Sequence, residues 1–329
     1  MLRFVFMFLA CAILLAPQGV TAQISTDIEP IDIHLTPRYP KPYETVTVTP
    51  GSTIVDLSAS TVTISADGKI LQKGTGTQGA AIQVGAAGET TTVTVTVAGP
   101  DGRQYSKQLT IRPGGVSLVV EPVSTTHPFY KGLSLVAPES RVRLIAIPDL
   151  RTSAKNQIDP ATLIYTWRFG DRVLESSSGI GRSVLVATAP LRYRDADIVL
   201  TVTSPDQNQV AEASVTISPV APLVRMYAFD PLRGPDYDNA IDTSFMLIAT
   251  EASFRAVPYF FAANPTLEWS VGGTAQGAQK DITVRSTGSG QGSATLEIRA
   301  KLVGALQVAS NRTLLRFGEG KSPLSIFGF

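Results

Sequence analysis

The sequence predicts an all-β protein made of three similar modules. Gly and Pro are plentiful, at 27 and 22 of 329 residues, while charged residues make up only 17%. This balance is typical of strand-rich and loop-rich proteins rather than helical or disordered ones. An apolar strand pattern with a central Trp and a following turn, LIYTWRFGDRVL at 163–174, returns further on as TLEWSVGGTA, and a degenerate copy precedes it as STVTISADGKI. We expect the central residues of the three copies, Ile64, Trp167 and Trp269, to lie in the module cores.

The first 22 residues have the features of a secretory signal peptide. A short segment with Arg3 precedes an apolar run from Phe4 to Ala16, and small residues occupy the expected cleavage positions. These features predict cleavage after Ala22 and export of the mature chain. We therefore expect the protein in the periplasm, at the cell surface or in the extracellular medium.

Cys11 is the only cysteine, and it lies within the predicted signal peptide. Leu9-Ala10-Cys11 resembles the lipid-attachment box of bacterial lipoproteins, so lipidation of Cys11 is an alternative. Cleavage there would leave a short apolar run, which favours cleavage after Ala22. The mature chain then has no cysteine for a disulfide, a zinc-thiolate site or a thiol nucleophile. An exported domain without disulfides points to a bacterial envelope.

The predicted mature chain is close to neutral. Removal of Arg3 leaves 27 of the 28 Lys and Arg residues against 27 Asp and Glu residues. Neutrality without a basic run argues against binding of nucleic acid or of anionic membrane surfaces. No segment after residue 22 has the roughly 18 unbroken apolar residues that a spanning helix needs, so we expect no transmembrane anchor in the mature chain.

Residues 23–113 form the first predicted module. Alternating apolar and polar residues predict antiparallel strands, and clusters of Gly, Pro and Asp predict the turns between them. About seven strands fit, as in an antiparallel sandwich. The runs that predict strands cover residues 31–35, 45–50, 61–70 with a hairpin turn at Asp67-Gly68, 80–84, 91–97 and 105–111.

Residues 114–219 repeat this order, and residues 220–318 repeat it again. The hairpin IVLTVTSPDQNQ of the second module parallels VTVTVAGPDGRQ of the first, which, with the Trp strands, indicates an internal repeat. In the third module we assign LVRMYAF to the first strand, SFMLIATE at 244–251 to the second and the Trp269 strand to the third. The junctions near Pro113 and Pro219 are short, so the modules are expected to stack with limited freedom.

These motifs resemble those of bacterial immunoglobulin-like (Ig-like) or PKD-type domains. LIYTWRFGDRVL and IVLTVTSPDQNQ carry the resemblance, which covers nearly all of residues 27–318. The arrangement and the PFYKG segment also look like a class of exported proteins of candidate-phylum, Parcubacteria-like bacteria. The resemblance implies three tandem Ig-like antiparallel β-sandwiches, a fold that hosts many unrelated activities. The first module departs from the pattern at Ile64, and the Cys pair of true immunoglobulin domains is absent.

Two stretches contain residues that could support chemistry. Residues 74–79, GTGTQG, match the dinucleotide fingerprint, but no helical pattern follows, so we interpret them as a hairpin loop. The acidic stretch 229–242 contains Asp230, Asp236 and Asp238, weak candidates for a calcium site. Their spacing does not fit an EF-hand, and the neighbouring prolines favour solvated turn residues. We predict no bound metal and no cofactor.

The two histidines do not indicate a catalytic site. His34 follows Asp32 by two residues, which places both side chains on one face of a strand while Ile33 points to the other. No nucleophile turn of the G-x-S-x-G type accompanies them. His127 lies in the segment THPFYKG, which combines Pro with aromatic residues. We predict that the protein is not an enzyme.

Each module carries a segment that combines Pro with aromatic residues. Such a segment could form a recognition surface, because aromatic side chains supply contact area at small entropic cost. The alternative is packing against the neighbouring module or at the end of the sandwich. The aromatic residues of these segments are Tyr39, Phe129, Tyr130 and Tyr237.

Residues 319–329 are the part of the chain that the fold explains least. A short link with two Gly residues is followed by an apolar end that contains Leu324, Ile326, Phe327 and Phe329. This end is too short to span a membrane. It could add a strand to another protein or fill a partner's groove, fold back onto the third module, or fray.

Together these features suggest an exported, non-enzymatic structural or interaction protein of the bacterial envelope or surface. Rigid modules would hold loops and the C-terminal segment away from the membrane, where they bind an envelope or surface protein such as a pilus or secretion assembly. The alternative is an extracellular carbohydrate-binding or adhesion protein. Its candidate residues are exposed tyrosines: Tyr39, Tyr130, Tyr237 and Tyr259.

Overall fold

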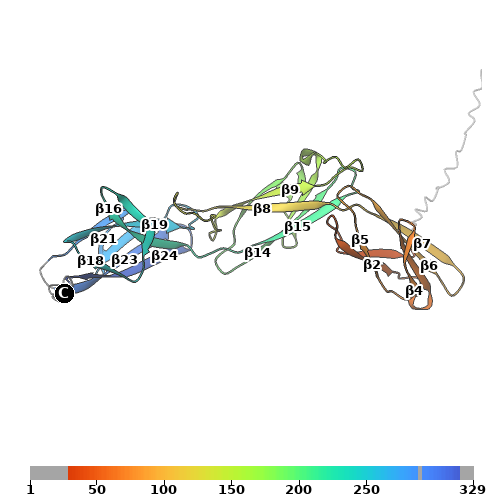
Figure 1. Cartoon of the computed structure of the whole chain (residues 1–329), viewed down its shortest axis with the longest axis horizontal. Coiled ribbons are helices and arrows are strands. Elements are labelled where there is room, and N and C mark those ends of the chain that lie inside the picture. Colours follow the sequence, from red (N-terminus) through yellow and green to blue (C-terminus); the bar gives the residue numbers. More distant parts are fainter. Residues whose placement is uncertain (1–28, 288–290, 319–329) are drawn as a thin grey trace, which may run out of the picture.

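The computed structural model describes residues 29–287 and 291–318. The predicted signal peptide with Cys11 and the C-terminal segment with Leu324, Ile326, Phe327 and Phe329 lie outside the described residues. The regular secondary structure of the described chain is nearly all β-strand, as the sequence predicts, and none of its helices is long and apolar enough to cross a membrane. Figure 1 shows the strands gathered into three bodies that follow one another along the long axis. We call these bodies modules 1, 2 and 3.

Module 1 is a sandwich of two antiparallel sheets. Its strands are β1 (Asp32–Thr36), β2 (Thr45–Gly51), β3 (Thr61–Ala66), β4 (Lys69–Thr75), β5 (Ala80–Gln83), β6 (Thr91–Ala98) and β7 (Gln104–Ile111). One sheet has the order β1-β2-β5 and the other β4-β3-β6-β7. In β6, Val93, Val95 and Val97 are fully buried while the threonines between them face outward. This period of two is what buries one face of each sheet.

Module 2 repeats this arrangement. Its strands are β8 (Gly115–Val123), β9 (Arg141–Asp149), β10 (Ile164–Phe169), β11 (Arg172–Val173), β12 (Gly179–Ile180), β13 (Val184–Thr188), β14 (Ala196–Thr203) and β15 (Val210–Ile217). One sheet has the order β13-β9-β8, and the other β11-β10-β14-β15 with β12 beside β10. Modules 1 and 2 therefore share one topology, as the internal repeat predicts.

Module 3 has the same sandwich, with a strand added at the edge of each sheet compared with module 1. Its strands are β16 (Leu223–Asp230), β17 (Gly234–Ile241), β18 (Ser244–Leu247), β19 (Glu251–Tyr259), β20 (Thr266–Val271), β21 (Thr274–Gly277), β22 (Asp281–Arg285), β23 (Gly292–Leu302) and β24 (Gln307–Phe317). The two sheets have the orders β17-β16-β19-β22 and β18-β24-β23-β20-β21. β18 runs parallel to β24, unlike the antiparallel pairs of modules 1 and 2.

The structure corrects two assignments in module 3. Residues 244–251 are not the second strand: they contain β18, and the second strand is β19, which lies antiparallel to β16 with Tyr259 opposite Leu223. The acidic stretch also forms a strand, β17, rather than turns alone. β17 is an edge strand, where Pro235 is tolerated because one side of the strand needs no ladder bond. Its pairing with β16 overrides a low intrinsic strand propensity.

The three copies of the central strand occupy equivalent places. Ile64, Trp167 and Trp269 are each at most 1% exposed, in β3, β10 and β20. Each strand pairs with the first strand of its module's last hairpin. Both indole N–H groups donate to a backbone carbonyl at 2.9 Å, Trp167 to Arg182 and Trp269 to Gln279. The repeated Trp thus packs in the module core and holds, by one hydrogen bond, the loop that leads into β13 in module 2 and into β22 in module 3.

Candidate functional site: the junctions between modules

Module 2 sends a segment across to module 3. We call residues 124–130, between β8 and β9, the strap. The Thr125 N–H donates to the Phe261 carbonyl at 2.8 Å, and the Phe260 N–H donates to the Thr125 carbonyl at 2.7 Å. The Phe261 N–H donates in turn to Thr125 Oγ1 at 3.0 Å. The strap is therefore bonded to module 3 largely through its main chain. Separation of the two modules would break each of these hydrogen bonds.

Aromatic side chains fill the space between the strap and the outer face of the β17-β16-β19-β22 sheet. The rings of His127 and Phe129 lie 4.4 and 4.8 Å from the Tyr237 ring of β17. The Tyr130 ring meets Tyr259 edge-on at 5.7 Å. The aromatic segments of modules 2 and 3 therefore pack on each other. Phe129 and Tyr130 nevertheless keep 65% and 37% of their surface exposed.

Tyr259 is buried beneath the strap. It is 7% exposed, and its hydroxyl lies 2.9 Å from the hydroxyl of Tyr227. Burial and this hydrogen bond raise the pKa of Tyr259 well above its ordinary value. Tyr259 is thus a packing residue of the junction and offers no surface to a glycan.

The last hairpin of module 3 adds a contact that the sequence does not reveal. Gln307 is fully buried; its side chain accepts a hydrogen bond from the Ala262 N–H at 2.9 Å and donates to the Pro138 carbonyl of module 2. Gln209 occupies the matching place in module 2, beside the start of β15. It bonds within its own module, accepting from the Arg151 N–H at 3.3 Å and donating to the Arg151 carbonyl at 2.5 Å. Gln307 therefore joins two modules while Gln209 stabilises one, because the backbone groups within reach of each side chain belong to different modules.

A cleft of about 500 Å³ opens beside the strap, between modules 2 and 3. Arg255 lies in it and forms a two-bond ion pair with Asp281, at 2.6 and 2.7 Å. Lys280 also lines the cleft and is exposed, with no ion-pair partner in the part of the chain that the structure describes. The lining further includes Thr126, His127, Tyr237 and Asn264. Among these residues, only Thr126, His127 and Tyr237 lie in segments that the sequence marks as candidates. Arg255, Lys280 and Asn264 belong to no motif.

His127 is held neutral in this cleft. Burial, together with the nearby charges of Arg255 and Lys280, lowers the pKa of the His127 imidazole below its ordinary value. The Phe129 N–H donates to His127 Nδ1 at 3.3 Å, an atom that can accept only when unprotonated. Protonation would therefore break this bond and place a third cation beside two others.

Acidification from about pH 7 to about pH 5 is expected to loosen the strap. Since the folded pKa of His127 lies below the unfolded value of about 6.5, its contribution is complete above that value and falls as the pH drops toward the folded pKa. The protection factors of the Phe260 and Phe261 amides, which correct the exchange rate for the fall of the intrinsic rate with pH, should decrease over this range, and much less in His127→Gln. An identical pH dependence in both proteins would contradict the role of His127.

Modules 1 and 2 are joined by charged groups and a close backbone approach. Glu89 pairs with Lys155 at 2.8 Å, and Arg112 lies 3.8 Å from Asp206. Gly88 has a φ of +83°, and a Cβ there would lie 2.5 Å from a backbone carbonyl of module 2. Glycine is therefore required at this position both for its backbone angle and for the contact.

Tyr39 lines a second cleft, of about 660 Å³, at this junction. The guanidinium of Arg38 lies 5.3 Å from the centre of the Tyr39 ring. Lys41 lines the same cleft from module 1, and Arg168 lines it from module 2. Arg168 is paired with Glu212 at 3.3 Å. The aromatic segment of module 1 therefore also lies against the next module.

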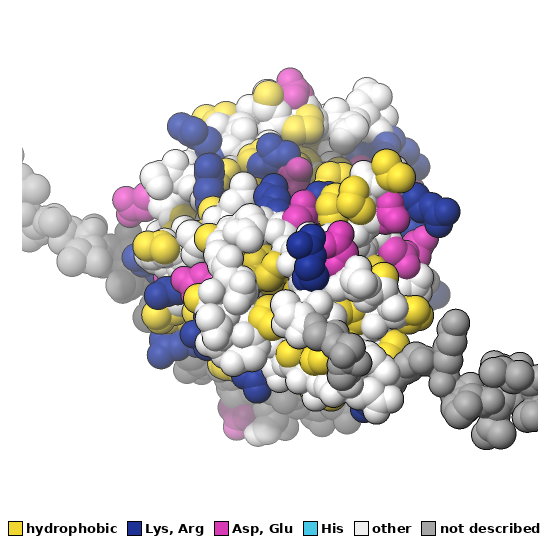
Figure 2. All heavy atoms as spheres, turned by 90° about the vertical axis from the view of Figure 1, so that its left-hand side faces the viewer, with side chains coloured by type: hydrophobic (Ala, Val, Ile, Leu, Met, Phe, Trp, Pro, Cys, Tyr) yellow, Lys and Arg dark blue, Asp and Glu magenta, His cyan; other side chains and the backbone are white. Residues whose placement is uncertain are grey.

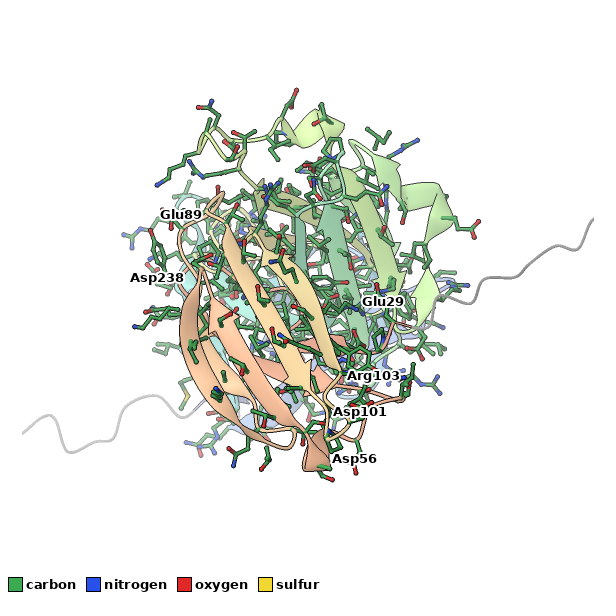
Figure 3. The ribbon with its side chains drawn as sticks, turned by 90° about the vertical axis from the view of Figure 1, so that its right-hand side faces the viewer. Glu29, Asp56, Glu89, Asp101, Arg103 and Asp238 are labelled. Atoms are coloured by element: carbon green, nitrogen blue, oxygen red, sulfur yellow. The ribbon has the colours of Figure 1, made fainter. Side chains whose placement is uncertain are left out.

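The two poles of the molecule present short turns. Figure 3 shows the N-terminal end, with Asp101 and Arg103 together in the β6–β7 turn, 3.5 Å apart, and Glu89 at the other end of module 1. Figure 2 shows hydrophobic side chains lying among charged ones at the opposite pole. Leu232 and Ile248 are 97% and 92% exposed, in the turns after β16 and β18.

The acidic candidates of module 3 serve local structure. Asp230 accepts hydrogen bonds from two backbone N–H groups of the turn that follows it, at 2.8 and 2.9 Å, and these bonds lower the pKa of its carboxyl. Asp236 accepts from Asn239 at 3.0 Å, and Asp238 lies on the same strand, β17. In residues 29–287 and 291–318, no group of three or more His, Cys, Asp or Glu is placed to hold a metal ion.

The remaining candidates lie apart from the junctions. His34 and Asp32 are on one exposed face of β1, 3.4 Å apart, as the strand pattern predicts. Residues 74–79 comprise the end of β4 and the connection to β5, and no helix opens on them. Neither place unites the groups that nucleotide binding or nucleophilic catalysis requires.

No family model matches the chain, and no curated protein matches it in sequence. Fibronectin(III)-like modules of Clostridium thermocellum CbhA are similar at 10% identity and a TM-score of 0.27, over 57% of this chain and 94% of that one. Three N-terminal domains of the bacteriophage RB49 outer capsid protein Hoc are similar at 14% sequence identity and a TM-score of 0.26, over 88% of this chain and 99% of that one. A bacterial ice-binding adhesin is similar at 12% sequence identity and a TM-score of 0.23, over 87% of this chain and 96% of that one. The Ig-like assignment therefore stands on the sheet topology of each module.

Proposed function

We propose that this chain is an exported, non-enzymatic structural and interaction protein of the bacterial envelope or surface. The observation that carries the proposal is the way the modules are joined. Main-chain bonds at Thr125, the buried Gln307 and the ion pair of Glu89 with Lys155 connect each module to the next. Such joints make an extended rod, which is a form suited to display rather than to enclosing a reaction.

A protein that presents binding surfaces to a partner needs its contact groups to lie away from the junctions between its own modules. The turns at the two poles meet this requirement. The C-terminal segment with Leu324, Ile326, Phe327 and Phe329 is a further candidate contact because of its apolar sequence. A strand added to a sheet edge or an apolar end set into a groove are the binding modes open to such a segment. The partner is an envelope or surface protein, with a pilus or secretion assembly as the leading class. Export is supported by the signal peptide pattern of residues 1–22.

Crosslinking capture from the native envelope tests this proposal. Two proteins are compared, the mature chain 23–329 and a version that ends at Gly318. A partner captured only by the longer protein assigns binding to the C-terminal segment, and the same partner captured by both assigns it to the module turns. Capture of no specific protein by either would contradict binding to an envelope protein.

A second candidate function is carbohydrate binding or adhesion outside the cell. The observation that favours it is the pair of inter-module clefts, which contain Tyr39 in one and Tyr237 in the other. Aromatic rings beside hydroxyl and amide groups suit sugar rings, which have an apolar face and polar edges.

A further inference from the structure

The two clefts are bordered by equivalent segments of successive modules. In module 1 the connection between β1 and β2 carries Arg38, Tyr39 and Lys41 and faces module 2. In module 2 the connection between β8 and β9 contains the strap, which faces module 3. Each of the first two modules therefore places its own aromatic segment beside a cleft that the next module completes.

The first cleft has one positive charge in excess. Arg168 is neutralised by Glu212, 3.3 Å away. Glu44 is the second carboxylate of the lining, and it accepts a hydrogen bond from the backbone N–H of Lys41 at 2.7 Å. Arg38 and Lys41 together supply two further cations, and neither side chain is ion-paired among the residues described. The cleft thus offers cationic groups close to the Tyr39 ring.

The second cleft has the same balance. Asp281 neutralises Arg255, which leaves the charge of Lys280, and no Asp or Glu lines the cleft. Arg255, Lys280 and His127 line this one cleft. Burial, and after it the charges of Arg255 and Lys280, lower the pKa of the His127 imidazole. Thr126 and Asn264 add polar groups near the Tyr237 ring.

This combination of groups selects one class of ligand. A metal ion would meet an excess of positive charge, and nucleic acid would need longer rows of cations. A wholly apolar ligand would leave the hydroxyl, amide and ammonium groups without partners. A sugar ring with a carboxylate satisfies all three features, since its apolar face packs on an aromatic ring, its hydroxyls hydrogen-bond and its carboxylate pairs with a cation.

We propose that the clefts at the two junctions bind an acidic saccharide, a glycan whose sugar rings carry carboxylate groups. In the first cleft Tyr39 packs against the sugar, while Arg38 and Lys41 hold the carboxylate. In the second cleft the sugar lies beside Pro128 and the exposed part of Tyr237, and Lys280 holds the carboxylate. Two such sites on one rod let a single long glycan bind at both, which raises the overall affinity through effective concentration. This inference rests on carbohydrate binding, the second candidate function.

Isothermal titration calorimetry of the mature protein 23–329 tests the inference. The probes are tetragalacturonate and tetramannuronate, each compared with its neutral methyl ester. We expect an acid form to bind more tightly than its ester, with the difference shrinking as salt is added. Lys280→Gln, and Arg38→Gln with Lys41→Gln, should each weaken binding of the acid roughly 2-fold to 5-fold and leave the ester unchanged.

Two further variants separate the contributions. Tyr39→Ala should weaken binding of acid and ester alike, because it removes the packing surface for the sugar ring. Lys73→Gln removes an exposed cation of β4 outside both clefts and should leave binding unchanged.

Several outcomes would overturn the inference. They are equal affinity for acid and ester, no binding of any probe, and full displacement by equimolar inorganic phosphate, which would reveal a site for anions in general. Capture of an envelope protein is measured separately, so either proposal can fail while the other stands.

Discussion

Trp167→Ala is expected to lower the free energy of unfolding of module 2 by about 3–5 kcal/mol. The indole is fully buried between the two sheets, and its N–H donates to the Arg182 carbonyl at 2.9 Å. The substitution leaves a cavity and removes the partner of that carbonyl, so packing and hydrogen bonding are lost together. For a domain of this size the loss is a large share of the total stability. Differential scanning calorimetry of the whole chain measures it as a downward shift of one transition.

Two comparison variants make the Trp167 result specific. Trp167→Phe keeps most of the apolar volume and loses the N–H, so we expect a smaller loss, about 1–2 kcal/mol. Ile180→Ala alters a side chain that is 70% exposed, and its effect should stay within about 0.5 kcal/mol. The cores of modules 1 and 3 are separate from that of module 2, so their transitions should not move. A loss for Trp167→Ala under about 1 kcal/mol would contradict its place in the core.

Gln307→Ala is expected to uncouple module 3 from module 2. The change leaves the Ala262 N–H and the Pro138 carbonyl without their partner, at a cost of about 1–3 kcal/mol in coupling between the modules. Small-angle X-ray scattering should show a broader range of end-to-end distances, and amide hydrogen exchange at Phe260 and Phe261 should rise. Each module keeps its own core, so the circular dichroism spectrum should stay unchanged.

Gln209→Ala is the matched control for the junction. Gln209 makes the corresponding pair of bonds to Arg151 inside module 2, so its removal should lower the stability of that module and leave the scattering profile unchanged. If both variants gave the same scattering profile as the native protein, Gln307 would not be a determinant of rod stiffness.

The strand pattern was sufficient to predict most of modules 1 and 2. The alternation of Thr and Val in β6 and the turn at Asp67-Gly68 depend on local chemistry, which the chain carries whatever lies beside it. Module 3 departs from this because β17 has a weak strand pattern and forms through its pairing with β16. The short β18 likewise takes a parallel place beside β24 that no local signal specifies. The sequence pattern thus predicts which residues form strands where one face of the strand is buried. It does not predict how a strand added at the edge of a sheet will pair.

The sequence by itself determined the all-β class, the three repeats and the central positions of Ile64, Trp167 and Trp269, because the period of two and the repeated residues are properties of the chain. Only the tertiary structure decided that the aromatic segments lie at the junctions and that Gln307 crosses between modules while Gln209 does not. It also brought Lys280 beside His127, although these residues are far apart in the sequence. Contacts between modules depend on which surfaces meet, and a single strand pattern does not contain that information.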